Sequence, residues 1–210
     1  LMSINLYNFI DDKFSDAPHL NKDSFIQAVQ VAIRALDEVL DYGYETQPLE
    51  ANRKCINDWR SVGLGLFGVA DALVAMKLKY GTDEANQFVA EVMRLMLIEG
   101  LRTSAEVAEV KGPFGRYDWT KTAKSPLLAL LKEEAPDVYE QVKAHGLRNG
   151  TLLSIAPTGT ISLLMGLFSG GCEPLYKISY MRTTHKMEGE HKSFKVYAHS
   201  IKDLLDYHEL

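Results

Sequence analysis

Residues with the chemistry to bind an anion cluster in one short stretch, at the point where an apolar run ends. Residues 149–162 read N-G-T-L-L-S-I-A-P-T-G-T-I-S. The run at 151–156 favours a buried strand, and Pro157 should end it because proline donates no hydrogen bond to a sheet. Gly159 allows a sharp turn, and the hydroxyl residues around it are typical of helix starts. The pattern predicts a strand, a tight turn and the beginning of a helix.

The predicted turn has two interpretations on these residues alone. The first N–H groups of a helix have no acceptor within it, so such a turn is a natural site for phosphate. An ordinary strand-to-helix turn with a threonine cap is the other interpretation, because helix N-termini without a ligand are common. Both remain open at this point. The residues of the candidate phosphate site are Pro157, Thr158, Gly159, Thr160, Ile161 and Ser162.

The composition limits the function classes. The chain has 210 residues, of which 46% are hydrophobic and 24% charged, and this suits one globular domain. The net charge is −5 without a basic block, so the sequence offers no electrostatic basis for binding DNA or RNA. No apolar run approaches the roughly 20 residues that span a bilayer, so we expect no membrane partner. The first 15 residues do not resemble a secretory signal.

The cysteines and histidines do not have the pattern of a metal site. Cys55 and Cys172 are far apart and lack the spacing of metal ligands, which is typical of a reducing, cytoplasmic protein. We expect Cys55 to be a buried structural thiol and Cys172 to pack as a small apolar residue. His185, His191 and His199 are six and eight residues apart, which fits no standard ligand pattern. The prediction is therefore that no metal is bound.

Four basic side chains offer a second candidate anion site. Scattered surface bases are the simpler interpretation, because such side chains are usually mobile and solvated. The four residues are Arg116, Lys121, Lys124 and Arg148.

Hydrophobic periodicity predicts a helix-rich α/β chain. Apolar residues recur with helical spacing from Asn21 to about Asp41, and Gly43 should end this helix. Residues 44–59 should form a connecting loop. Thr82 is a candidate cap for a second long helix that runs to about residue 110. Further helices are predicted at 127–132, 137–144, 161–168 and 199–205, strands at 2–10 and 174–180, and a polar loop at 186–195.

The stretch from Gly63 to Gly68 has the spacing G-x-G-x-x-G of dinucleotide-binding turns. That interpretation requires a hydrophobic strand directly before the motif, which residues 57–61 do not resemble. We predict instead a helix whose small residues let a neighbouring backbone come close. A strand ending near Val62 would favour a nicotinamide oxidoreductase, whereas a helix through Gly65 and Gly68 would exclude it.

Several segments resemble one enzyme family. A-P-T-G-T-I-S at 156–162, followed by S-G-G-C-E-P at 169–174, resembles the catalytic subunit of ribonucleotide reductase. S-I-N-L at 3–6 and R-S-V-G-L-G at 60–65 are similar to further segments of that family. The motif A-P-T-G-T-I-S is most similar to that of the adenosylcobalamin-dependent class. Cys172 departs from the family, which usually has an aliphatic residue before Glu-Pro.

The resemblance implies a fold, an activity and partners. The fold would be part of the second half of a ten-stranded α/β barrel, in which residues 157–162 hold the substrate diphosphate. The activity would be conversion of ribonucleotides to deoxyribonucleotides for DNA replication, by a cysteine thiyl radical and a reducing cysteine pair. Adenosylcobalamin would generate the radical, whereas other classes use a partner subunit. The implied partners are the ribonucleotide substrate, the remainder of the reductase chain and a second copy in a homodimer.

The family's catalytic cysteines are not found in this sequence. The segment N-x-C-x-E, which supplies the radical-bearing cysteine, is absent, and the reducing cysteine near S-I-N-L would precede Leu1. We therefore expect a single fragment of the barrel domain, with no catalytic residue and no activity alone. Its expected parts are a strand, helix and loop at 1–62, a helical part at 63–148, the phosphate loop at 149–180 and a last part at 181–210. A non-catalytic anion-binding or interaction module on the same fold is the alternative.

Overall fold

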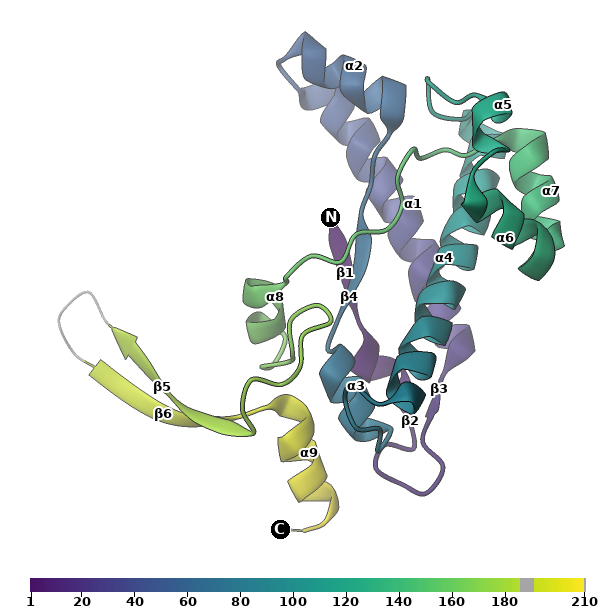
Figure 1. The fold of residues 1–210 in the computed structure, drawn as a ribbon. Coiled ribbons are helices and arrows are strands. Elements are labelled where there is room, and N and C mark those ends of the chain that lie inside the picture. Colours follow the sequence, from purple (N-terminus) through teal and green to yellow (C-terminus); the bar gives the residue numbers. More distant parts are fainter. Residues whose placement is uncertain (186–190, 210) are drawn as a thin grey trace. The chain divides into compact units, whose positions relative to one another are not determined.

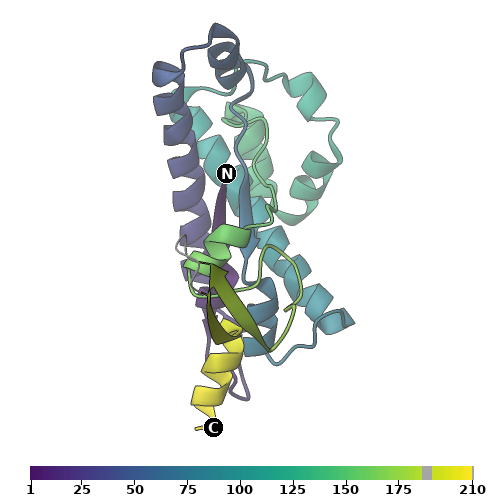
Figure 2. The same ribbon diagram turned by 90° about the vertical axis from the view of Figure 1, so that its left-hand side faces the viewer.

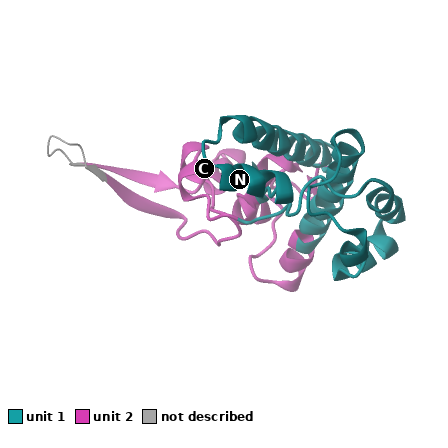
Figure 3. Cartoon of the chain, turned by 90° about the horizontal axis from the view of Figure 1, so that it is seen from above, with its two compact units in different colours: residues 1–4, 22–65, 90–155 teal, residues 5–21, 66–89, 156–210 magenta. Residues whose placement is uncertain are grey.

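Two compact units make up the chain in the computed structural model, which describes residues 1–185 and 191–209. Unit 1 comprises residues 1–4, 22–65 and 90–155, and unit 2 comprises residues 5–21, 66–89 and 156–210 (Figure 3). The described residues form helices and two-stranded sheets but no closed barrel. The helix-rich α/β prediction is thus confirmed, whereas the ten-stranded barrel stays a prediction.

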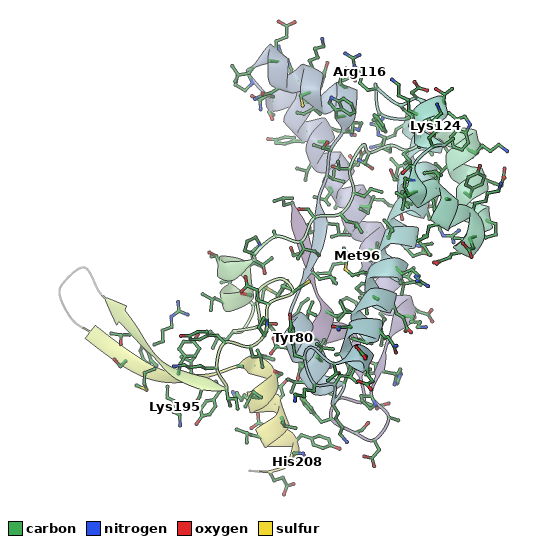
Figure 4. All side chains as sticks on the ribbon, in the orientation of Figure 1. Tyr80, Met96, Arg116, Lys124, Lys195 and His208 are labelled. Atoms are coloured by element: carbon green, nitrogen blue, oxygen red, sulfur yellow. The ribbon has the colours of Figure 1, made fainter. Side chains whose placement is uncertain are left out.

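Unit 1 is built on two long helices. Its helices are α1 (Lys22–Thr46), α2 (Glu50–Trp59), most of α4 (Asp83–Lys111), α5 (Trp119–Thr122), α6 (Pro126–Glu134) and α7 (Pro136–His145) (Figure 1). Gln30 of α1 donates a hydrogen bond to Glu99 of α4 over 3.2 Å, and Arg34 pairs with Glu106 at 2.6 Å. The two helices therefore run side by side in the same direction. Met96 of α4 is fully buried (Figure 4).

The predicted apolar stripe of α1 is confirmed over most of its length. The buried members are Phe25, Val29, Ala32, Ile33 and Leu36. The expected end at Gly43 is wrong, because α1 continues to Thr46. One glycine inside a helix costs only about 1 kcal/mol, which by itself does not end a helix of 25 residues.

Helix α2 contradicts the loop that was predicted for residues 44–59. It spans Glu50–Trp59 and packs against α1, but it has no buried residue. A helix without a buried face lacks the apolar repeat on which a prediction from sequence depends.

The predictions of the second long helix and of the helices at 127–132 and 137–144 are confirmed. Helix α4 is continuous through Gly100, and Thr82 accepts a hydrogen bond from the N–H of Ala85 over 3.4 Å at its start. Helices α6 and α7 each begin with a proline, which suits the first helical turn. Gly146 ends α7 with a φ of 80°, a value that glycine adopts without steric cost.

Three extended segments meet in unit 1. Strand β1 (Met2–Asn5) is hydrogen-bonded to β4 (Leu64–Phe67), and the two lie side by side in both views (Figures 1 and 2). On its other side, Leu64 forms a parallel bridge with Leu153. The N–H of Leu64 donates to the Leu152 carbonyl over 2.8 Å, and the N–H of Ser154 donates back over 3.0 Å. The segment 151–154 therefore extends the sheet toward Pro157.

Strand β4 corrects the interpretation of the glycine motif. Gly65 lies in a strand rather than a helix, and Gly68 has a φ of 68° directly before α3 (Val69–Ala75). A Cβ on Gly65 would come within 2.3 Å of the Ser154 carbonyl oxygen. The predicted close approach of a neighbouring backbone is thus present, but on a strand. The strand lies within the motif and not before it, so the geometry of a dinucleotide-binding turn is not formed.

A buried carboxylate joins three parts of unit 1. Asp37 of α1 is 1% exposed and accepts hydrogen bonds from Arg60 over 2.7 and 2.9 Å. Arg148 donates to the same carboxylate over 3.2 Å, and so does the side-chain amide of Asn149. Arg60 precedes β4 and Asn149 precedes the segment 151–154. The network therefore holds together the residues that lead into β4 and into the segment 151–154.

Unit 2 contains an aromatic cluster and short elements. They are the 3-10 helix η1 (Leu6–Phe9), strands β2 (Ile10–Asp11) and β3 (His19–Leu20), helices α3, α8 (Gly159–Leu164) and α9 (His199–Tyr207), and strands β5 (Ser179–His185) and β6 (His191–Tyr197). The ring of Tyr7 lies 5.5 Å from that of Phe168, and its hydroxyl donates to Asp203 over 2.6 Å. Burial and this hydrogen bond raise the pKa of the Tyr7 hydroxyl, which therefore remains a donor.

The last part of the chain differs from several predictions. Helix α8 ends at Leu164 rather than at residue 168, because Gly166 and Leu167 both have positive φ values. The predicted strand at 174–180 is displaced to β5, which pairs antiparallel with β6. The loop predicted at 186–195 lies outside the described residues over 186–190 and is otherwise a strand. The helix expected from His199 is confirmed.

We predict opposite effects of alanine at two glycines of unit 1. Gly65→Ala should destabilise the chain by about 1–3 kcal/mol, because the new methyl overlaps a backbone carbonyl that cannot move freely. Gly43→Ala meets no atom within 4 Å inside α1 and should stabilise by about 0.5–1 kcal/mol. Urea unfolding followed by circular dichroism measures both. Equal midpoints for the two variants would contradict the close contact at Gly65.

Candidate functional site

The predicted turn and helix start are confirmed at residues 157–162, whereas the predicted strand at 151–156 is an extended segment with a single bridge, between Leu153 and Leu64. Sheet hydrogen bonds extend from Thr151 to Ser154, and the chain then passes Pro157 into α8. Thr158 directly precedes α8 and has a φ of 53°, in the left-handed region. This conformation costs a residue with a Cβ roughly 1–2 kcal/mol, so surrounding contacts must maintain it.

The hydroxyl of Thr158 holds a neighbouring loop rather than its own helix. It accepts a hydrogen bond from the N–H of Gly171 over 2.9 Å, and α8 has no side-chain cap. Thr158 does occupy the cap position that was expected. The expected hydrogen bond from its side chain to α8 is wrong, because the hydroxyl bonds to Gly171 instead. A Cβ on Gly170 would lie 2.5 Å from the Pro157 carbonyl oxygen. Residues 170–171 thus clamp the entrance to α8.

Ser162 also serves the fold. Its N–H donates to the Thr158 carbonyl over 2.9 Å, and its hydroxyl donates to the Gly159 carbonyl over 3.2 Å. Its side chain is buried. Of the three hydroxyl groups that the sequence singled out, only that of Thr160 is exposed and without a recorded partner among the described residues.

Three consecutive exposed residues at this turn have backbone N–H groups that find no acceptor within residues 1–185 and 191–209. Gly159, Thr160 and Ile161 are all exposed, and no acceptor for their N–H groups is recorded in the described part of the chain. These groups carry the partial positive charge of a helix N-terminus. Together with the Thr160 hydroxyl they can donate to phosphate oxygens. A pocket of unit 2 borders the clamping loop at Ser169 and Gly170 and includes Lys177.

The four basic residues do not form one anion site. Arg148 is buried in the network around Asp37 and is not available to a ligand. Arg116 lies 3.2 Å from Asp58, and Lys121 lies 3.5 Å from Asp118. Arg116 and Lys124 are exposed in the segment around α5 (Figure 4). The surface interpretation is therefore confirmed for three residues and wrong for Arg148.

The two cysteines differ in burial, and the prediction of a buried thiol fails for Cys55. Cys55 is exposed on α2, so the expected buried thiol is wrong for the same reason that α2 was missed. Cys172 is half-buried, and burial raises the pKa of its thiol. It therefore remains a neutral, packing side chain, as predicted.

The histidines give no metal geometry in the described residues. There, no three potential ligand side chains lie close enough together to hold a metal ion. Nδ1 of His199 lies 2.9 Å from the Gly166 carbonyl, while the side chains of His185 and His191 are outside the described part.

Comparison with known proteins identifies the family. A profile described as the ribonucleotide reductase barrel domain matches residues 1–208. The chain belongs to this family. It is 29% identical over 87% of its length to the ribonucleoside-diphosphate reductase subunit alpha of Chlamydia pneumoniae. It is 30% identical over 90% of its length to a vitamin B12-dependent ribonucleoside-diphosphate reductase of Thermoplasma acidophilum.

The chain spans only part of these ribonucleotide reductases. It covers 19% of the Chlamydia pneumoniae protein and 21% of the Thermoplasma acidophilum protein. It also covers 26% of the reductase large chain of Encephalitozoon cuniculi, to which it is 28% identical. In the described part of the chain, every helix is too short or too polar to cross a lipid bilayer.

We predict that the clamp on Pro157 is intolerant of a side chain at Gly170. Gly170→Ala should destabilise unit 2 by about 1–3 kcal/mol and shift the amide resonances of Thr158 and Gly171. Gly159→Ala is the matched control, because its Cβ would meet no atom within 4 Å and its free energy of unfolding should change by no more than about 0.5 kcal/mol. Similar losses in both variants would refute the clamp.

Proposed function

We propose that this chain is the part of a ribonucleotide reductase that holds the diphosphate of the substrate. The observation that carries the proposal is the row of three exposed backbone donors at Gly159, Thr160 and Ile161. They lie in the segment whose sequence most resembles the family. The family match covers nearly the whole chain. The proposed site comprises Pro157, Thr158, Gly159, Thr160, Ile161 and Ser162.

Each residue of the proposed site has a separate task. The N–H groups of residues 159–161 and the hydroxyl of Thr160 donate to diphosphate oxygens. Gly159 leaves open space in front of the helix, since a Cβ there would meet nothing within 4 Å. Thr158 and Ser162 shape the turn through their internal hydrogen bonds. Pro157 ends the strand and is held by residue 170.

The reaction of the parent enzyme requires residues beyond this chain. In this proposal, the full-length reductase reduces ribonucleoside diphosphates, and its radical-bearing and reducing cysteines lie in other segments. This chain then contributes phosphate binding and scaffold but no catalytic residue. The remainder of the reductase chain and the ribonucleotide are its partners, in a homodimeric enzyme of the cytoplasm.

Adenosylcobalamin is the radical source that the proposal favours. The similarity of A-P-T-G-T-I-S to that class supports it, as does the vitamin B12-dependent relative. The N–H donors at residues 159–161 fit phosphate oxygens of the substrate. We therefore assign no residue of this chain to binding adenosylcobalamin.

A non-catalytic anion-binding module is the second candidate function. The same three donors favour it, because they would bind any phosphate group irrespective of the nucleoside. In that case, the double variant Thr158→Ala, Ser162→Ala would change partner binding without any dependence on nucleotide.

We predict that a ribonucleoside diphosphate shifts the amide resonances of residues 158–162. In a titration with cytidine diphosphate, these shifts should appear for the chain and the full-length protein, whereas cytidine alone should leave them unchanged. Gly159→Val should abolish them, because its branched side chain fills the open space in front of the donors. Lys124→Gln, which alters an exposed base of unit 1, is the control that should retain them. Absence of shifts in the full-length protein would refute the proposed site.

We also predict that the purified 210-residue chain forms no deoxynucleotide. The physical reason is that it lacks the N-x-C-x-E segment that would carry the thiyl radical. The measurement is a product assay with cytidine diphosphate, a chemical reductant and adenosylcobalamin. Protein-dependent formation of deoxycytidine diphosphate would contradict the assignment of catalysis to other segments.

A further inference from the structure

A fully buried carboxylate lies behind the clamping loop of unit 2. Asp71 of α3 is 0% exposed, and no ion pair of this residue is recorded among the described residues. One oxygen accepts the N–H of Ser169 over 2.7 Å. The other accepts the N–H of Ser200 over 3.2 Å and the Ser200 hydroxyl over 2.6 Å. Three donors thus satisfy a charge that would otherwise be costly to bury.

The peptide of Ser169 is held from both sides by the start of α3. Its N–H donates to Asp71, and its carbonyl accepts the N–H of Gly68 over 2.8 Å. The next two residues, Gly170 and Gly171, make the contacts with Pro157 and Thr158 that shape the turn. A continuous series of contacts therefore leads from the carboxylate to the left-handed residue before α8.

Helix α8 cannot maintain this geometry alone. It has only six residues, and short helices depend on tertiary contacts rather than on their own hydrogen bonds. The unfavourable φ of Thr158 must likewise be imposed from outside. The direction of the three N–H groups therefore depends on the contacts that hold residues 169–171 in place.

We propose that Asp71 is a positioning residue for substrate diphosphate, acting through Ser169 and the 170–171 clamp on Thr158. The proposal rests on the proposed function of the loop at residues 157–162. One oxygen of Asp71 accepts from Ser169 and the other from Ser200. Alanine at position 71 would remove both acceptors, including the one that holds the Ser169 N–H.

The test compares the affinity of the full-length reductase for cytidine diphosphate and for cytidine, by calorimetric titration. Asp71→Ala, which removes the acceptor of the Ser169 N–H, should lower the diphosphate-to-nucleoside affinity ratio by about tenfold, the effect expected when a buried hydrogen bond is lost. Ser200→Ala is the matched control. It removes a hydrogen bond to the same carboxylate on the α9 side and leaves the Ser169 bond intact, so the ratio should not change.

The outcomes separate the two proposals. No preference of the wild-type protein for the diphosphate would overturn the proposed function. A wild-type preference that Asp71→Ala leaves unchanged, or that Ser200→Ala reduces equally, would overturn the positioning role alone.

A measurement on the wild-type protein covers the case in which Asp71→Ala fails to fold. Coupling between sites is reciprocal, so diphosphate binding should slow hydrogen exchange at the Ser169 amide, and cytidine should not. Unchanged exchange at Ser169 on saturation with cytidine diphosphate would overturn the role of Asp71.

Discussion

The burial of Asp37 between two arginines is the interaction on which the sheet of unit 1 depends. Arg60 and Arg148 come from segments far apart in sequence, yet both donate to a carboxylate that is 1% exposed. Removing both arginines would leave a buried charge without an ionic partner from these segments, and leaving such a charge unpaired costs about 3–5 kcal/mol. The two arginines precede β4 and the segment 151–154, so the carboxylate holds the residues that lead into both. The chain reaches Pro157, and hence the candidate site, from the second of them.

Unit 2 also has a buried carboxylate on a helix, but its hydrogen-bond donors are of other types. Asp71 has backbone and hydroxyl donors in place of guanidinium groups, and it fixes a loop rather than a strand. Both carboxylates lie on helices, and each accepts a hydrogen bond from a residue more than 90 positions away in the sequence. Buried acids on helices thus connect distant segments whose own secondary structure is short or irregular.

The sequence predicted the elements that have a repeating apolar face. Helices α1 and α4 were found because Val29 and Val92, among others, recur with helical spacing and are buried. Helix α2 was missed because it buries nothing, and β4 because its glycines hide the alternation of a strand. The strand predicted at 174–180 overlaps only the start of β5, and β6 was missed because residues 186–195 were interpreted as a polar loop.

The candidate site was predicted in position but not in detail. Pro157 and Gly159 indicate the turn from local chemistry alone, and the family resemblance indicates its ligand. The sequence does not show that the Thr158 hydroxyl bonds to Gly171, thirteen residues away, so that Thr160 provides the exposed hydroxyl. Nor does it distinguish Asp71 from a surface acid, because hydrogen bonds between distant residues depend on tertiary structure. Such partners follow from the packed chain and not from spacing.

The most direct test of the central claim is a crystal structure of the full-length protein with bound cytidine diphosphate. The account predicts diphosphate oxygens within about 3 Å of the backbone nitrogens of Gly159, Thr160 and Ile161, with Thr158 still bonded to Gly171. A diphosphate bound elsewhere, with these three N–H groups facing solvent, would contradict it.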